Sequence, residues 1–550
     1  MNLQFVTSTG RGAIVACSAL LACGAPEDEN RLSAAAELGG DPGGEVAAAA
    51  TCDGSVPCLL SAGLVFSNSL WPSPDGQRVV FLRRADNVIS LYSVPVRGGT
   101  PVRLSELPSP SFRAIAPDGS RVLYVAAPAP GQPLALFSVP IAGPASAGVL
   151  IARDVSSAFA SAQVSPDSRK VVYLVSNRRQ LRVVPTGGPA DAGARLTGEF
   201  ANPQGGIAGD LNDPGFMIGG NGASVVYRAA QERPQAELFR VPLTLTPDPD
   251  PPTIKLNGLL VEGGNVSSFR LAAATPDVIY RANQDDQTKF ELFRVKMNGT
   301  ERVKLNVPLP PDWNATEVQD APPAALRGYH LAPGDARVVY EVANVVVSPT
   351  EQRLYSVPTA GPASANVRLD APPTGIQAAS YRVSEDGRQV VYDTRDPDGV
   401  TFALLTVPTG GPAGASVELL TQRGEPQFVL TPNSQQVVFV RSGADPGLFR
   451  GPIAGGSAVR IDGPEVPGRL PAVTPDSARV VYVASTGETD VFSAPLGAGG
   501  ARVNLTAALP TVAVAPVAPI LTADGVHAVY TVLPAVGSDE QLYSSQIVPP

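Results

Sequence analysis

Histidine is almost absent from this chain, which has two histidines, four cysteines and two tryptophans among 550 residues. Histidine is the usual general base and a common metal ligand, and neither His330 nor His527 has a partner at metal-ligand spacing. We therefore expect structural roles for both, no metal site and no cofactor. The sequence also lacks a Gly-x-Ser-x-Gly elbow, a P-loop, a Gly-x-Gly-x-x-Gly run after a strand and a Cys-x-x-Cys pair. These absences argue against a propeller-gated serine peptidase and against the chemistry of the other motifs.

Positive charge is scarce as well. The net charge is −9, lysine is rare beside arginine, and no basic stripe with interleaved aromatic residues occurs. A nucleic-acid partner is therefore not expected. No stretch carries apolar residues at the i, i+3, i+4 and i+7 spacing of an amphipathic helix, which excludes helical repeats. The 54 glycines and 56 prolines punctuate short strands and do not indicate disorder.

The chain does contain a two-part sequence motif that recurs ten times. Its first part reads Ser-Pro-Asp-Gly-Gln-Arg-Val-Val-Phe at residues 73–81, and its second reads Leu-Tyr-Ser-Val-Pro at residues 91–95. The aromatic residues that close the first part lie 43 to 60 residues apart, at Phe81, Tyr124, Tyr173, Tyr227, Tyr280, Tyr340, Tyr392, Phe439, Tyr482 and Tyr530. This spacing is the period of propeller blades.

Each unit divides into the four strands of a blade. In the third unit we expect strands at residues 159–165, 170–175, 181–185 and 194–197, separated by turns of Pro, Asp, Asn and Gly. The second strand is apolar on consecutive residues, Val-Val-Tyr, and does not alternate with polar ones. This pattern fits a sheet that is covered on both faces, as each blade is covered by its two neighbours.

The fourth strands predict how the ring closes. Nine of them follow their anchors, at residues 102–104, 148–151, 194–196, 254–256, 303–305, 367–369, 417–419, 459–461 and 503–505. The last unit stops after its third strand, whereas residues 57–61 resemble residues 101–105 and precede the first anchor. We therefore predict an all-β propeller of about ten four-stranded blades, in which the N-terminal strand completes the last blade. The alternative is two smaller propellers, divided at the proline-rich connection 308–323.

The Ser-Pro-Asp-Gly, Val-Val-Tyr and Leu-Tyr-Ser-Val-Pro phrases resemble the repeat of TolB-type propellers, a relative of WD40-like repeats, over nearly all of residues 57–547. The resemblance implies a β-propeller of the bacterial cell envelope. It implies little about function, because such blades host binding proteins, peptidase gates and lyases. TolB has an α/β domain before its propeller, for which this chain has no room. The tryptophan usual before the Pro-Asp-Gly turn is nearly absent, with Trp71 alone close to it, so no partner contact is carried over.

The N-terminal segment predicts export. Arg11 precedes an apolar stretch, residues 12–22, that is too short to span a bilayer and is typical of a secretory signal. The stretch ends in Leu-Leu-Ala-Cys-Gly, which resembles the bacterial lipobox with Cys23 as the lipidated residue. A rival box ends at Cys17 but leaves too short an apolar segment after Arg11, and simple signal cleavage with loss of Cys23 is the other alternative.

These features give a domain organisation and a compartment. We expect a signal peptide at residues 1–22, a lipid-anchored flexible tether at 23–51 and the propeller at 52–550. The protein is then an outer-membrane lipoprotein that faces the periplasm or the cell surface, and it contacts the membrane through its lipid alone. In the mature chain Cys52 and Cys58 are the remaining cysteines, and an exported protein is expected to join them in a disulfide.

Three innermost strands begin with an aromatic residue and an arginine. The arginines are Arg113, Arg270 and Arg382. Because first strands line the central channel of a propeller, these guanidinium groups are candidates for an anion-binding channel. The alternative is that each arginine pairs with an aspartate of a neighbouring blade and holds the ring together.

The function expected from these observations is binding. We interpret the chain as a monomeric, non-enzymatic β-propeller that binds an envelope protein or an anionic ligand, or serves as a scaffold. The alternative is a lyase or hydrolase that acts on an anionic saccharide or peptide in the central channel. That alternative needs a cluster of acid, base and metal ligands, for which the chain has few histidines.

Overall fold

The computed structural model describes residue 52 and residues 57–548, apart from 158–160, 210–214, 249–250, 317–327, 345–350, 371–376, 397–398, 444, 464–465, 468–470, 486–488, 498, 510–512, 515–518 and 534–538. All of these belong to the second of two units into which the chain divides, residues 48–550. The expected signal peptide and the whole expected tether, residues 23–51 with Cys23, lie outside the described residues. No helix among the described residues has the length and apolar character needed to cross a membrane.

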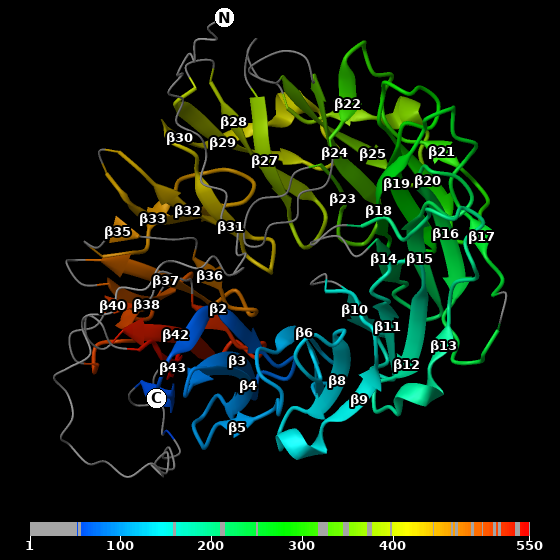
Figure 1. The fold of residues 1–550 in the computed structure, drawn as a ribbon. Coiled ribbons are helices and arrows are strands. Elements are labelled where there is room, and N and C mark those ends of the chain that lie inside the picture. The colour runs from blue at the N-terminus through cyan, green and yellow to red at the C-terminus, as the bar shows by residue number, and fades with distance from the viewer. Residues whose placement is uncertain are drawn as a thin grey trace, which may run out of the picture. The chain divides into compact units, whose positions relative to one another are not determined.

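This second unit is an all-β propeller of ten four-stranded antiparallel blades, as the sequence predicted (Figure 1). We number the blades 1 to 10 from β2 onward. The first strands of successive blades are β2 (Val65–Pro72), β6 (Ser111–Ile115), β10 (Ala162–Val164), β14 (Phe216–Ile218), β18 (Val266–Leu271), β22 (Trp313–Ala315) with β23 (Tyr329–Leu331), β27 (Gln377–Val383), β31 (Gln427–Leu430), β35 (Val466–Pro467) with β36 (Ala472–Val473), and β40 (Ala513–Val514) with β41 (Ile520–Leu521).

The second strands carry the anchors. They are β3 (Arg78–Ala85), β7 (Arg121–Ala126), β11 (Lys170–Leu174), β15 (Ser224–Ala229), β19 (Asp277–Ala282), β24 (Arg337–Asn344), β28 (Gln389–Arg395), β32 (Gln436–Arg441), β37 (Arg479–Ser485) and β42 (His527–Leu533). The third strands are β4 (Val88–Pro95), β8 (Ala135–Pro140), β12 (Leu181–Pro185), β16 (Glu237–Pro242), β20 (Glu291–Lys296), β25 (Gln352–Pro358), β29 (Thr401–Pro408), β33 (Gly447–Pro452), β38 (Thr489–Pro495) and β43 (Gln541–Gln546).

The fourth strands lie at the outer edge of each blade and are mostly short. They are β5 (Val102–Arg103), β9 (Val149–Ala152), β13 (Ala194–Arg195), β17 (Ile254–Lys255), β21 (Val303–Lys304), β26 (Val367–Arg368), β30 (Val417–Arg423), β34 (Val459–Arg460), β39 (Val503–Asn504) and, for blade 10, β1 (Cys58–Ser61). The last of these is the predicted N-terminal strand.

The hydrophobic core lies between neighbouring blades. All ten anchor aromatics are buried. The Val-Val-Tyr pattern arises because one residue of the second strand faces the preceding blade and the next residue faces the following one. Tyr227 of β15, for example, packs in one cluster with Val172 of the preceding blade, whereas Val226 packs in another with Tyr280 of the following blade. Burial on both faces therefore explains the absence of alternation.

The Ser-Pro-Asp-Gly phrase forms the turn between the first two strands. In blade 1 the Ser73 hydroxyl donates to Asp75 Oδ1 over 2.5 Å, and the backbone N–H of Gln77 donates to the same oxygen over 3.0 Å. The Ser73 oxygen in turn accepts the N–H of Arg78 over 2.9 Å. Side chains of the turn thus satisfy backbone groups that the sheet leaves unpaired.

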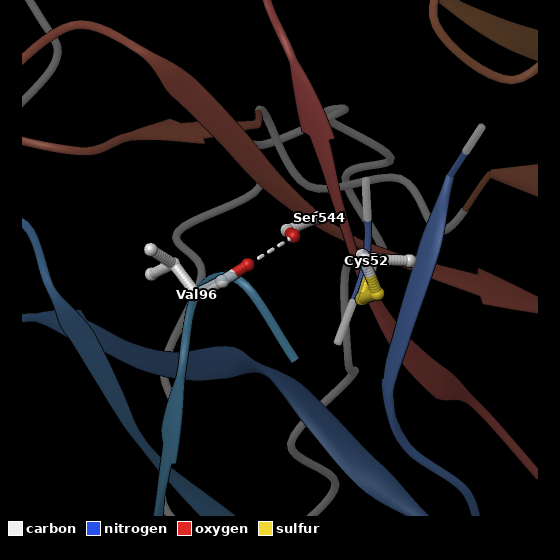
Figure 2. Close-up of a disulfide and its surroundings, with 4 residues drawn as sticks. Cys52, Val96 and Ser544 are labelled. Atoms are coloured by element: carbon white, nitrogen blue, oxygen red, sulfur yellow. Dashed lines mark hydrogen bonds between the residues drawn. A yellow bond between two sulfur atoms is a disulfide. The ribbon is translucent and has the colours of Figure 1, made fainter. Parts of the chain in front are cut away.

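The ring closes where the sequence predicted. β1 pairs antiparallel with β43, with Cys58 opposite Ser544 and Leu59 opposite Tyr543. A disulfide joins Cys52 to Cys58, whose Cα atoms lie 5.7 Å apart, and this bridge lies beside the Ser544–Val96 contact (Figure 2). The blue strands of blade 1 accordingly lie beside the red strands of blade 10 in Figure 1.

The alternative of two smaller propellers is wrong. Leu305 of blade 5 and Tyr340 of blade 6 belong to one hydrophobic cluster, so the core continues across the connection 308–323. Trp313, within that connection, forms part of the first strand of blade 6 and packs in the same cluster.

Candidate ligand-binding clefts

The three candidate arginines lie on the first strands of blades 2, 5 and 7. Arg113 on β6 donates to Ser111 Oγ over 2.6 Å, and it reaches toward blade 3, where Ser161 Oγ accepts over 3.4 Å and the carbonyl of Ser157 over 3.3 Å. Burial lowers the pKa of Arg113 to about 10. Arg113 therefore contacts serines of both blade 2 and blade 3.

The other two arginines also approach the following blade. Arg270 on β18 donates to the carbonyl of Phe269 over 3.2 Å, and its charge opposes the burial that raises the pKa of Tyr329 of blade 6 to about 12. Arg382 on β27 lies 5.7 Å from the ring centre of Phe428 of blade 8, and burial lowers its pKa. An anion bound between these arginines stays a prediction.

The two histidines lie on strands of blades 6 and 10. His330 on β23 meets Tyr381 edge to face, with ring centres 5.8 Å apart. His527 on β42 is buried, and burial lowers its pKa. Within the described part of the chain, no three His, Cys, Asp or Glu side chains are grouped as metal ligands.

A repeated polar bridge closes the outer part of several seams between blades. In blade 7 the Tyr392 hydroxyl lies 3.0 Å from Ser416 Oγ, which donates to the carbonyl of Leu369 of blade 6 over 3.4 Å. In blade 6 the Tyr340 hydroxyl donates to Asn366 Oδ1 over 2.6 Å, and Asn366 Nδ2 donates to the carbonyl of Leu305 of blade 5 over 2.5 Å. Ser416 and Asn366 each directly precede the fourth strand, and we call this place in the repeat the bridging position.

Other blades fill the bridging position with different polar groups. In blade 5 Arg302 donates from Nε to the carbonyl of Leu256 over 2.7 Å, and in blade 4 Thr253 hydrogen-bonds Tyr227. In blade 10 the Tyr530 hydroxyl lies 2.6 Å from Ser545 Oγ, which donates to the carbonyl of Leu505 over 3.0 Å. In blades 6 and 7 the residue at the bridging position links a tyrosine anchor to a carbonyl that follows the fourth strand of the preceding blade, and in blade 10 Ser545 of the third strand makes the same link.

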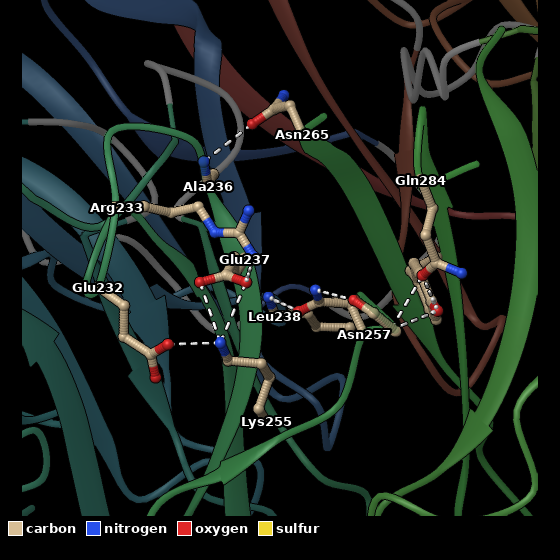
Figure 3. A network of polar contacts seen from close by, with 11 residues as sticks. Glu232, Arg233, Ala236, Glu237, Leu238, Lys255, Asn257, Asn265 and Gln284 are labelled. Carbon is tan, nitrogen blue, oxygen red and sulfur yellow. Dashed lines mark hydrogen bonds and ion pairs between the residues drawn. The ribbon is translucent and has the colours of Figure 1, made fainter. Parts of the chain in front are cut away.

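The seam between blades 4 and 5 shows how densely such a region can be filled (Figure 3). The Gly258 N–H donates to Gln284 Oε1 over 2.9 Å, and the Tyr280 hydroxyl donates to the same oxygen over 2.9 Å. Nearby, the fully buried carboxylate of Glu237 receives Arg233 at 3.0 Å and Lys255 at 3.1 Å.

Blades 2 and 3 lack a side chain at the bridging position. Four 3-10 helices, η1 (Ala145–Ala147), η2 (Ala190–Ala192), η3 (Ala363–Ala365) and η4 (Ala413–Ala415), precede the position in blades 2, 3, 6 and 7. The next residues are Gly148, Gly193, Asn366 and Ser416, with φ of −69°, −83°, −64° and −63°. These φ angles suit any L-residue, although a Cβ at Gly148 lies 2.9 Å from the Ala145 carbonyl oxygen and a Cβ at Gly193 lies 3.0 Å from that of Val183.

Each of the two seams with glycine has a cleft. A cleft of about 630 Å³ between blades 2 and 3 has a polar lining of Arg153, Asp154, Tyr173, Asn177, Gln180, Arg182 and Asp191. A smaller cleft of about 220 Å³ between blades 1 and 2 is lined by Glu106, Tyr124, Phe137, Gly148 and Arg153, among others. Arg153 lines both, and we call the two together the blade 2 clefts.

Burial and neighbouring charges set the state of the polar groups in these clefts. Burial raises the pKa of Tyr173, and nearby Arg182 opposes that shift. Burial and the charge of Glu106 raise the pKa of Tyr124 to about 12. The Asp154 carboxylate accepts the Ser176 hydroxyl over 2.5 Å, and the buried Nε of Arg182 has no hydrogen-bond acceptor among the residues that the structure describes. The larger cleft is therefore lined by one phenol, that of Tyr173, together with charged side chains.

Sequence reasoning did not predict these clefts. The signal is nevertheless present in the repeat, because aligning the residue before each fourth strand places Gly148 and Gly193 against Thr253, Arg302, Asn366 and Ser416. The alignment alone does not show that residues at this position contact the tyrosine hydroxyl, and the structure is needed to see that contact.

Comparison with known proteins gives only remote similarity. No protein-family model matches the chain, and no curated protein matches it. Among solved structures, a TolB structure from Agrobacterium tumefaciens is 12% identical, and the match covers 48% of this chain and 81% of that one with a TM-score of 0.27. A structure described as the eukaryotic initiation factor is 12% identical, with 73% and 89% of the chains covered and a TM-score of 0.44.

An enzyme is among the similar structures. Prolyl oligopeptidase B from Galerina marginata, bound to a 25mer macrocyclization substrate, is 12% identical with a TM-score of 0.34. The match covers 62% of this chain and 47% of that one, so the chain spans about half the length of that protein.

Proposed function

We propose that this protein is a non-enzymatic binding propeller that holds a small polar ligand in the blade 2 clefts. The observation that carries the proposal is the cleft of about 630 Å³ between blades 2 and 3, with its polar lining. Its volume falls in the range of small-molecule sites, about 300–1,000 Å³. A few converging polar groups in such a cleft give a ligand its orientation.

The nature of the lining groups supports binding over catalysis. The cleft has two guanidinium groups, from Arg153 and Arg182, and two carboxylates, from Asp154 and Asp191. It has no histidine, the side chain that most readily exchanges protons near neutral pH. The raised pKa of Tyr173 keeps this phenol protonated, so it serves as a hydrogen-bonding group.

Thermal unfolding of the full chain tests this function. The probes are amino acids, nucleoside monophosphates, dicarboxylates and uncharged disaccharides, each at millimolar concentration. We expect at least one class to raise the Tm of the wild-type protein and not that of an Arg153→Ala/Arg182→Ala variant. Arg169→Ala is the control, because Arg169 is exposed on a turn of blade 3 and does not line the cleft. The proposal fails if no class raises the Tm, or if the double variant responds like the wild type.

The second part of the proposal concerns location. We propose an exported protein of the bacterial envelope, held at the membrane by a lipid on Cys23 and by a tether at residues 24–51, and able to meet an envelope partner. The Leu-Leu-Ala-Cys-Gly segment and the disulfide between Cys52 and Cys58 support it, because disulfides persist in oxidising compartments. Radiolabelled palmitate should enter the wild type and Cys17→Ser but not Cys23→Ser. Equal labelling of both variants contradicts the anchor.

A further inference from the structure

In almost every blade the residue type at the bridging position follows the type of the anchor: a polar residue accompanies tyrosine, and an apolar residue accompanies phenylalanine. Blades 1 and 8 have phenylalanine anchors, Phe81 and Phe439, and place Pro101 and Ala458 before the fourth strand. Tyrosine anchors accompany the polar residues Thr253, Arg302, Asn366, Ser416 and Arg502. Blade 10 supplies Ser545 from its third strand. Blades 2 and 3 break the match, because Tyr124 and Tyr173 accompany Gly148 and Gly193.

We infer that the ligand of the blade 2 clefts is an uncharged saccharide, one of whose hydroxyl groups takes the place of the side chain missing at Gly193. The inference rests on the proposed function and names its ligand class. Three observations carry it: the chemistry of the bridge in other blades, the balance of charges in the lining, and the size of the clefts.

The bridge in other blades shows which chemical group fits the vacant place. In blade 7 a single hydroxyl, that of Ser416, donates to the carbonyl of Leu369 and accepts from the Tyr392 hydroxyl. A hydroxyl can do both at once, whereas a carboxylate cannot donate and an ammonium cannot accept. A hydroxyl is therefore the group that reproduces the blade 7 bridge, whereas in blade 5 the guanidinium of Arg302 donates to the corresponding carbonyl.

The open seam contains the two groups that correspond to the partners of Ser416 in blade 7, and the Tyr173 hydroxyl is also hydrogen-bonded to Arg182. Tyr173 is the anchor, and Ile151 corresponds to Leu369, because Ile151 packs against Gly188 as Leu369 packs against Gly411. A ligand hydroxyl between the Tyr173 hydroxyl and the Ile151 carbonyl would reproduce the bridge of blade 7. In blade 7 a side chain of the protein forms this bridge. In blade 3 a hydroxyl group of the ligand would form it.

The remaining lining groups suit several hydroxyls and no net charge. Arg153 and Arg182 donate, Asp154 and Asp191 accept, and the amides of Asn177 and Gln180 do both. Two cations and two anions give no net attraction for an ion, but they match a ligand whose neighbouring hydroxyls each donate and accept. Because Arg153 also lines the 220 Å³ cleft, a saccharide of more than one ring can contact both clefts.

Filling the bridging position tests the inference. Gly193→Ser introduces the side chain that blade 7 already has at nearly the same backbone angles. A Cβ at Gly193 lies 3.0 Å from the carbonyl oxygen of Val183 and 3.3 Å from that of Ala190, so the neighbouring backbone must shift by a few tenths of an ångström to admit it. Gly187→Ser is the matched control, because a Cβ there meets nothing within 4 Å and Gly187 does not line the cleft. The probes are maltose, cellobiose and chitobiose, titrated by calorimetry into the full chain.

We expect at least one disaccharide to bind the wild type and Gly187→Ser equally, and to bind Gly193→Ser at least about tenfold more weakly. Asp191→Ala, which leaves the seam open, should also weaken binding, so that the inference stays testable if Gly193→Ser does not fold. The inference is overturned if the disaccharides bind Gly193→Ser as tightly as the wild type. If amino acids, nucleotides or dicarboxylates bind in their place and binding is lost in Arg153→Ala/Arg182→Ala, the saccharide is wrong and the proposed function stands. If nothing binds, both fail.

Discussion

Ser544 donates a hydrogen bond of 2.5 Å from Oγ to the backbone carbonyl of Val96, a residue 448 positions away in the sequence. Ser544 lies on the third strand of blade 10, and Val96 follows the third strand of blade 1. The N–H of Cys52 donates to the carbonyl of Arg97 over 3.1 Å at the same seam. The seam that closes the ring is therefore held by polar contacts to blade 1 as well as by the strand pairing within blade 10.

The closing strand should contribute to stability through its buried face. Leu60 is 1% exposed and packs with Phe81 and Leu542, whereas Leu59 on the same strand is 39% exposed. We expect Leu60→Ala to lower the free energy of unfolding by about 3 kcal/mol and Leu59→Ala by less than about 0.5 kcal/mol. Denaturant unfolding of both variants measures this. Equal effects would show that β1 does not close the core.

The turns between the first two strands should make stability depend on acid pH. Hydroxyl donors lower the pKa of four turn aspartates, Asp75, Asp118, Asp167 and Asp476, below the usual 3.8. The folded state then favours their charged form, so this stabilisation is present above about pH 4 and is lost as the pH falls through the lowered pKa values.

Replacing all four aspartates with asparagine tests this dependence. Asn433 already occupies the same place in blade 8, where Thr431 donates to it over 2.8 Å, so the turns should persist. The Tm of the fourfold variant should fall less steeply below about pH 4 than that of the wild type. Parallel Tm curves over that range would contradict the assignment.

Ser434 should show two opposing effects at one position. It has a φ of +59°, in the left-handed region, and its Oγ accepts the N–H of Asp386 of the preceding blade over 2.9 Å. Ser434→Gly relieves the backbone strain and loses the hydrogen bond, so its stability should change by less than about 0.5 kcal/mol. Ser434→Ala loses the bond and keeps the strain, so it should cost about 1–2 kcal/mol. Denaturant unfolding decides, and an alanine variant as stable as the glycine variant would contradict this view.

The stability of the fold should depend on the cations that pair with the buried carboxylate of Glu237. Glu237 is fully buried, and Lys255 lies 3.1 Å from it. Lys255→Met removes one of its two cations and should cost about 3 kcal/mol. Lys289→Met is the control, because Lys289 pairs with the exposed Asp286 at 3.8 Å and should matter by less than about 0.5 kcal/mol. If the two variants are equally stable, the ion pair does not hold this carboxylate.

The arginines on the first strands allow a test of the anion-binding channel. If Arg113, Arg270 and Arg382 bind an anion together, the triple alanine variant should bind polygalacturonate at least about tenfold more weakly than the wild type at low salt. The single variants should each weaken binding by a smaller factor. An unchanged affinity in the triple variant would leave these arginines with the contacts between blades described above.

The sequence predicts the blades well because their signals are local. The predicted third strand of the third unit, residues 181–185, coincides with β12 (Leu181–Pro185), since the turns on either side depend on Pro, Asn and Gly within a few residues. The clefts could not be predicted in this way. The larger cleft is lined by Arg153 and Asp154 of blade 2 together with Tyr173 and Arg182 of blade 3, a combination of two blades that no short segment encodes. The direction of the Arg113 side chain toward Ser161 depends likewise on the neighbouring blade.

The pairing of β1 with β43 fixes an order of events during synthesis. The ribosome makes Cys58–Ser61 before any other strand of the propeller and Gln541–Gln546 after all the others. Nine blades can assemble on the nascent chain, while the tenth must wait for translation to reach its third strand. Until then β1 has no strand to pair with, so the propeller is complete only when β1, which is synthesised first, pairs with β43, which is synthesised last.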